Sequence, residues 1–180
     1  MRITLDHNCI IDLERRTEMG RLIEAIIASS GNQCFVVNIG ASEMREKGVR
    51  PEHYEKFEEL LSAARVELLP RLNPMGIYGV TFWDKCVWGS DEGNQLIQDI
   101  AAVLFGDQSL MDLVTEDIDS PIGRKWLNRI CDVHTMWCHI HNGNDIFLTT
   151  DKNFKKETKL QKLISLGAVR ICNPKEMQPL

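Results

Sequence analysis

Two segments of the chain place a carboxylate at the end of an apolar run and an asparagine two residues further on. Asp6 and Asn8 follow the first apolar run, and Asp151 and Asn153 follow the run 146–150. Each run is typical of a buried strand, and each asparagine stands where a helix would begin. A carboxylate at that place is costly unless its charge is used. Because ligands and metal ions bind at the carboxyl ends of parallel strands, the pattern predicts a functional site.

Two more acidic residues have contexts that could bring them to the same place. Glu43 stands near the start of a helix that we expect to begin at about Ala41, directly after the β-rich run 34–39. Asp132 lies mid-helix beside an apolar stripe, where aspartate is a poor helix former. Taken alone, Asp151 could be only an N-cap and Glu43 only a solvated first-turn residue. Taken together, the candidate catalytic and metal-binding residues are Asp6, Glu43, Asp132 and Asp151.

Four gathered carboxylates form a donor set for a hard divalent cation. Mg²⁺ takes oxygen ligands, commonly a few carboxylates with waters and substrate phosphates. Like charges packed so closely repel one another, so the cluster is unfavourable without the cation. The chemistry that such a site supports is phosphodiester hydrolysis, in which the metal activates water and stabilises charge in the transition state.

The elements that must position these acids alternate between strand and helix. Strands are expected at residues 2–6, 34–39, 66–69, 145–150 and 168–172. Helices are expected near 9–15, 19–29, from about 41, from Pro51 to Arg65, from Ser120-Pro121 to about 141, and at 153–166. This alternation predicts an α/β fold with a parallel sheet and right-handed crossovers.

The segment at about 70–121 interrupts the alternation. It begins with proline, glycine and aromatic residues, continues as an amphipathic helix that should stop at Gly106, and ends in an acidic stretch. With too few core residues to stand alone, it is expected to be an insertion in a single domain spanning 1–180. Its Trp83 and Trp88 could stack on unpaired bases or belong to a core or interface.

Composition limits the class of protein. The chain has 180 residues and 43% hydrophobic residues, with no run that approaches a membrane span. A strand begins almost at once, without a basic region and a long apolar segment, which predicts a cytoplasmic protein. The six cysteines form no C-x-x-C pair and are expected to be reduced and buried. The net charge of −5 argues against purely electrostatic nucleic-acid binding, although four metal-binding carboxylates would account for much of it.

Three blocks of sequence together resemble the PIN-domain family of nucleases. The opening block 5–13 is similar to their pattern of strand, Asp, small hydroxyl, Asn and apolar residues. Block 38–43 looks like the context of their second acid, with Glu43 at a helix start. The closing block contains Asp132, Gly143 and then the strand and T-x-D-x-x-F pattern of 146–154, which is the most specific part. The resemblance covers residues 1–69 and 122–172.

The resemblance implies a three-layer α/β/α sandwich with a parallel five-stranded sheet in the order 3-2-1-4-5. It also implies Mg²⁺- or Mn²⁺-dependent cleavage of RNA, often as the toxin of a toxin–antitoxin pair. Asp6, Glu43, Asp132 and Asp151 would then bind metal or its waters. Positioning roles would fall to Asn8, Thr149 and Asn153, and phosphate contacts to Arg45, Lys47, Arg50 and Lys152. A solvated helix face is the alternative for the more distal lysines.

Two departures and two alternatives accompany this resemblance. His7 stands where the family usually has Ser or Thr, and the insertion has no counterpart in the compact toxins. The expected partner is single-stranded RNA. An antitoxin-like protein and a second copy of the chain are further possible partners, and no membrane is expected. The alternative function is a degenerate PIN-like module that binds a protein or nucleic acid without cleavage. A phosphatase is the third option, although Asn8 replaces the second acid of a D-x-D pair.

Overall fold

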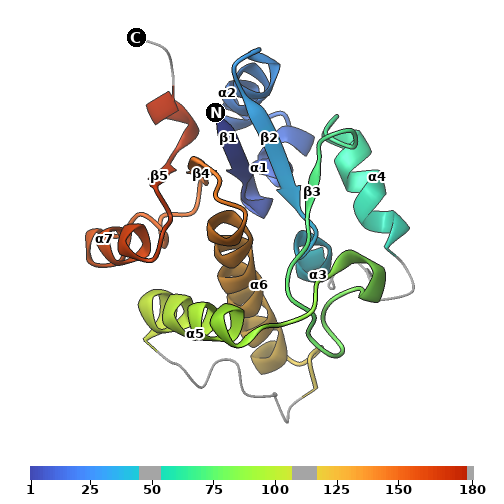
Figure 1. Cartoon of the computed structure of the whole chain (residues 1–180). Coiled ribbons are helices and arrows are strands. Elements are labelled where there is room, and N and C mark those ends of the chain that lie inside the picture. The colour runs from blue at the N-terminus through green and yellow to red at the C-terminus, as the bar shows by residue number, and fades with distance from the viewer. Residues whose placement is uncertain (45–53, 107–116, 178–180) are drawn as a thin grey trace.

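The computed structural model describes residues 1–44, 54–106 and 117–177, and a parallel five-stranded sheet lies at its centre (Figure 1). The sheet has the order β3-β2-β1-β4-β5, and all four neighbouring pairs are parallel. The strands are β1 Arg2–Leu5, β2 Gln33–Val37, β3 Arg71–Leu72, β4 Ile146–Leu148 and β5 Arg170–Cys172. The predicted fold class and strand order are therefore confirmed.

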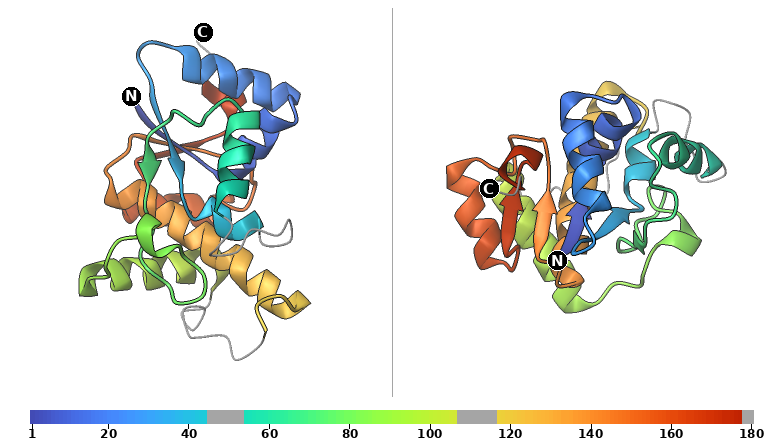
Figure 2. Two further views of the ribbon diagram at one scale, coloured as in Figure 1. Left: turned by 90° about the vertical axis from the view of Figure 1, so that its right-hand side faces the viewer. Right: turned by 90° about the horizontal axis from the view of Figure 1, so that it is seen from above.

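Helices cover both faces of the sheet, as the two views in Figure 2 show. One face packs against α1 (His7–Glu14), α2 (Glu18–Ala28) and α4 (Glu55–Ala63), and the other against α5 (Asp91–Phe105), α6 (Pro121–His141) and α7 (Glu157–Ser165). Side chains alternate between the faces because successive strand residues point in opposite directions. In β2, for example, Val36 packs in the core beneath α1, α2 and α4, whereas Phe35 packs in the core beneath α5, α6 and α7.

Local sequence signals account for the ends of the long helices. Ser120 caps α6 by accepting a hydrogen bond from the Gly123 amide at 3.0 Å, and Pro121 occupies the first turn. In the same way Ser90 caps α5, which ends at Gly106 with a left-handed φ of 72°. The predicted start of α6 and the predicted stop of α5 are therefore confirmed.

The third strand was predicted wrongly, at 66–69. Those residues form a turn in which Leu68 is 92% exposed, while the Val66 amide bonds back to the Leu61 carbonyl at the end of α4. The strand forms after Pro70, whose carbonyl accepts from the Val36 amide at 3.0 Å. Helix capping thus draws Val66 away from the sheet, and the pairing shifts to Arg71–Leu72.

The first residues of the predicted insertion at about 70–121 form β3, so the insertion begins only after Leu72. Its helix α5 packs against α6 and α7 and contributes Ile97, Ile100 and Leu104 to the core of that face. It therefore shares the core of the sheet rather than forming one of its own.

All six cysteines are free, and five are buried while Cys86 is partly exposed. Among the described residues, no helix is both long and apolar enough to cross a membrane.

Arg65→Gly should raise the free energy of unfolding by about 0.5–1 kcal/mol. Arg65 ends α4 with a φ of 60°, a left-handed conformation that glycine adopts without a Cβ penalty. Its surface ion pair with Glu24, at 3.9 Å, contributes little. Chemical denaturation would measure the change. Ala63→Gly, inside the last turn of α4, should instead lower stability, and a loss of stability in Arg65→Gly would contradict the argument.

Candidate active site

Asp6 is held at the carboxyl end of the central strand. Its amide donates to the Leu148 carbonyl at 3.0 Å, which extends the pairing of β1 with β4 by one residue. One carboxylate oxygen, Oδ1, accepts from the His7 amide at 2.8 Å and so caps α1. The side chain is nearly inaccessible, with only 2% of the residue exposed.

The hydroxyl of Thr149 joins Asp6 to Asp151. Its Oγ1 donates to Asp6 Oδ2 at 2.6 Å and accepts from the Asp151 amide at 2.9 Å. The Asp151 carboxylate in turn accepts from the Asn153 amide at 2.8 Å, which holds the turn after β4. One buried hydroxyl therefore positions both acids of the two matched sequence segments.

Glu43 reaches the same region from the short helix α3 (Gly40–Glu43), which follows β2. Its Oε2 lies 3.9 Å from His7 Nε2, and its side chain remains 20% exposed. Asp132 comes from the middle of α6, which packs against α3. Two helices thus bring the third and fourth acids toward the strand end that carries Asp6.

The charges of neighbouring acids act on the carboxyl groups of Asp6, Glu43 and Asp132. Burial, opposed by the bonds from Thr149 and His7 and reinforced by the charge of Asp151, raises the pKa of Asp6 to about 6. Burial and the charges of Asp6 and Asp151 raise the pKa of Asp132 to about 8. Burial, with the charges of the other three acids, raises the pKa of Glu43 well above its usual range. The four predicted acids are therefore within electrostatic reach of one another at this end of the sheet.

Carboxylate oxygens such as those of the four acids are suitable ligands for a hard divalent cation, although the side chains are not arranged as a coordination sphere. Within residues 1–44, 54–106 and 117–177, no group of three or more His, Cys, Asp or Glu side chains is arranged to hold a metal ion. The carboxylates nevertheless carry a burial and repulsion cost that a cation would relieve. Binding would require them to approach one another more closely.

The other predicted residues have different outcomes. The exposed Asn8 hydrogen-bonds to the Asp6 side chain, and Thr149 and Asn153 have the contacts described above. Lys152 is exposed beside Asp151. The remaining phosphate-contact candidates, Arg45, Lys47 and Arg50, lie outside the described residues.

A lysine groove adjoins Asp151. Its volume is about 680 Å³, and it lies where β4 and β5 end. It is lined by Met19, Thr150, Asp151, Lys152, Lys155, Lys156, Asn173, Lys175 and Glu176. Ion pairs tie Lys155 to Glu176, and Lys175 to Glu18 at 3.3 Å. Positive charge is thus concentrated next to the acids, in a chain whose net charge is −5.

Sequence reasoning assigned no specific role to two residues of this region, although it counted Lys159 among the lysines that follow Asp151. Lys159 donates to Asn153 Oδ1 and to the Leu104 carbonyl, and its charge acts on Asp132. No local pattern separates it from the other lysines of its helix. Asp12 accepts from the hydroxyl of Thr150 at 3.2 Å. Its position four residues after Asn8, on the same helix face, is a signal that could have identified it.

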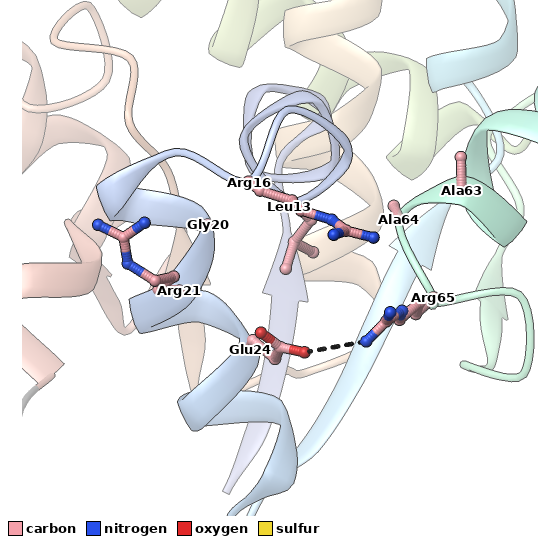
Figure 3. A pocket seen from close by; sticks show the side chains of 8 residues that line it. All are labelled: Leu13, Arg16, Gly20, Arg21, Glu24, Ala63, Ala64 and Arg65. Carbon is pink, nitrogen blue, oxygen red and sulfur yellow. Dashed lines mark ion pairs between the residues drawn. The ribbon is translucent and has the colours of Figure 1, made fainter.

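A second pocket, of about 270 Å³, lies away from the acids (Figure 3). It is lined by Leu13, Arg16, Gly20, Arg21, Glu24, Ala63, Ala64 and Arg65. The close view shows Arg65 facing Glu24 across it, while Arg21 turns its guanidinium away. None of the four predicted acids lines this pocket.

Comparison of the chain with family models, with curated proteins and with solved structures finds no match. The resemblance to PIN-domain nucleases therefore stays a prediction, and the geometry of the site carries the functional argument.

Asp132→Asn should stabilise the metal-free protein, and the gain should grow as pH rises from about 4 to about 8. Because the pKa of the folded-state carboxyl is raised to about 8, the folded protein holds a proton that the unfolded chain has already lost in this range. Stability of the unmodified chain falls accordingly, and the gain at pH 8 should reach at least the roughly 1.4 kcal/mol of one pKa unit.

Thermal or urea unfolding at several pH values in EDTA would measure this gain. Glu59→Gln, an exposed change on α4, is the matched control and should show no such trend. Addition of Mn²⁺ at pH 8 should stabilise the unmodified chain more than Asp132→Asn. A gain that does not depend on pH would contradict the electrostatic argument.

Proposed function

We propose that the protein is a metal-dependent endoribonuclease of the PIN type that hydrolyses RNA phosphodiester bonds. Asp6, Glu43, Asp132 and Asp151 would hold Mg²⁺ or Mn²⁺. The observation that supports this most is that acids from the end of β1, from α3 and from α6 are all wholly or partly buried near Asp151. Burial first, and the charge of Asp151 in addition, raise the pKa of each of them. A fold that gathers such unfavourable charge at the ligand-binding edge of a parallel sheet has a use for it.

The chain's own residues would hold the site in place. Thr149 fixes the carboxylate of Asp6 and the backbone of Asp151, and the α1 amide at His7 fixes the other oxygen of Asp6. Such support orients acidic ligands before substrate arrives and lowers the cost of reaching the reactive geometry. When bound, a divalent cation supplies water activation and stabilises charge on the scissile phosphate.

The lysine groove would take the phosphates that flank the scissile bond. Lys152 and Lys156 line it beside Asp151, and Lys155 and Lys175 retain acidic partners at its edge. Phosphate contacts position a nucleic acid without reading its sequence, so the groove supports RNA as substrate but no particular sequence. The same contacts predict binding that weakens as salt concentration rises.

Asp6→Asn should lower Mn²⁺-dependent cleavage of single-stranded RNA by at least about 100-fold. The amide keeps the size of the side chain, and its single oxygen can still accept from the His7 amide. Its NH2 group, which can only donate, would then face the Thr149 hydroxyl, and the side chain lacks the charge that a cation requires. Cleavage of a labelled oligoribonucleotide in Mn²⁺, with an EDTA blank, measures the effect.

Glu59→Gln should cleave like the unmodified chain, because it changes an exposed acid on α4. Equal activity in Asp6→Asn and the unmodified protein would reject the site. Mn²⁺ binding and RNA binding without any cleavage would favour the non-cleaving module instead. Turnover of a phosphate monoester in place of RNA would favour a phosphatase.

Thr149→Val should weaken the apparent affinity for Mn²⁺ by about 10–100-fold. Valine keeps the shape of the side chain but removes the hydroxyl that contacts both Asp6 and the Asp151 amide. Thr149→Ser retains that hydroxyl and should recover most of the affinity. A Mn²⁺ titration monitored by calorimetry and by cleavage rate separates a positioning role from a loss of folding. Identical Mn²⁺ curves for the valine and serine variants would refute this role.

A further inference from the structure

The segment 73–90 begins at the same edge of the sheet as the acids. It leaves the carboxyl end of β3, and Ser42 of α3 donates its hydroxyl to the Val80 carbonyl at 2.8 Å. Ser42 is the neighbour of Glu43. Phe82 packs edge-on against Tyr54, with ring centroids 4.9 Å apart. The segment is therefore attached directly to the helix that carries one of the four acids.

The backbone of this segment is tied down. Met75 and Val87 form a parallel bridge, flanked by hydrogen bonds from the Gly76 amide to the Val87 carbonyl at 2.9 Å and from the Val87 amide to the Pro74 carbonyl at 2.8 Å. Met75, Val80 and Phe82 are buried and anchor it to the body of the protein. Side chains that remain outside are thus presented by a fixed loop.

The largest aromatic residues of the loop are the ones left outside. Tyr78 is 82% exposed, Trp83 is 71% exposed and Trp88 is 90% exposed. The three line a single pocket of about 320 Å³ together with Gly76, Cys86, Val87 and Gly89. Aromatic side chains are the largest apolar contributors to protein cores and interfaces, so a fixed loop that exposes three of them gives up considerable stabilisation. Such a patch marks a surface that meets another molecule.

We propose that this aromatic pocket binds an unpaired base of single-stranded RNA beside the acids. This inference rests on the proposed function, because it assigns the substrate's conformation. Exposed aromatic faces combined with a positively charged track are the arrangement that binds single-stranded nucleic acid. Here the track is the lysine groove, whose charge complements the phosphates of RNA.

The order of features along the sheet edge selects RNA as the occupant. The aromatic pocket follows β3, three of the acids (Glu43, Asp6 and Asp151) follow β2, β1 and β4, and the lysine groove lies at the ends of β4 and β5. Four strand spacings of about 4.8 Å separate the two outer strands, a span on the order of 19 Å. A single extended strand could therefore contact the base pocket and the phosphate groove while passing the acids. A duplex keeps its bases stacked and would not enter the pocket.

Binding of a labelled single-stranded oligoribonucleotide in EDTA, where no cleavage interferes, tests the pocket. Trp88→Ala and Trp83→Ala should each weaken binding by about 5–150-fold, as expected from the loss of one base-stacking contact. Trp88→Phe should retain much of the affinity. Leu68→Ala removes an equally exposed apolar side chain outside the pocket and should bind like the unmodified chain. Circular dichroism verifies that each variant is folded.

Two further ligands separate stacking from charge. An oligonucleotide with abasic sites should bind the unmodified chain about as weakly as the parent RNA binds Trp88→Ala. Double-stranded RNA of the same sequence should bind both proteins equally. Unchanged single-strand affinity in both tryptophan variants, or full affinity for the abasic strand, overturns the pocket.

The test also separates this inference from the proposed function. If the unmodified chain binds single-stranded RNA through the tryptophans but does not cleave it in Mn²⁺, the pocket stands and the nuclease fails. If it cleaves RNA while the tryptophan variants bind normally, the nuclease stands and the pocket fails. If the unmodified chain binds no single-stranded RNA, the proposed base-binding role of the pocket is wrong. This holds even if Trp83 and Trp88 turn out to bind a protein.

Discussion

The carboxylate of Asp6 is buried against the central strand, and the rest of the edge is arranged around that charge. Burial makes ionisation of this group costly, and the hydroxyl of Thr149 and the amide of His7 offset only part of the cost. The neighbouring acids add to the burden, because the charges of Asp6 and Asp151 also disfavour ionisation of Glu43 and Asp132. Gathering these carboxylates therefore lowers the stability of the fold, as is common where an active site is preorganised.

Much of the fold could be predicted because its signals are local. The Ser120-Pro121 pair predicts the start of α6, and Gly106 predicts the end of α5, since capping chemistry depends on adjacent residues. The strand order came from the family resemblance. The third strand could not be located in the same way: residues 66–69 have strand-like composition, but the cap of α4 takes Val66 and moves the pairing beyond Pro70. Competition between a helix end and a sheet edge is a tertiary effect.

For the candidate site, the sequence predicted the acids at strand ends but not the contacts that form only on folding. Matched strand, acid and asparagine contexts identified Asp6 and Asp151, because both depend on strand ends that sequence patterns reveal. The double contact of Thr149 and the reach of Lys159 to Asn153 depend on segments brought together only by folding. The exposure of Trp83 and Trp88 could not be predicted from the sequence either. Their residue type favoured a core or interface, whereas in the structure Val80 and Phe82 are buried and the two indoles stay exposed.

The outermost strands have a bearing on self-association. At one border β3 is two residues long and directly follows a proline, and at the other β5 has three residues. Borders this short offer few free amide and carbonyl groups to a neighbouring chain, which protects a sheet from uncontrolled stacking into aggregates. A dimer formed through helices away from this edge would leave the row of strand ends accessible to a long flexible ligand.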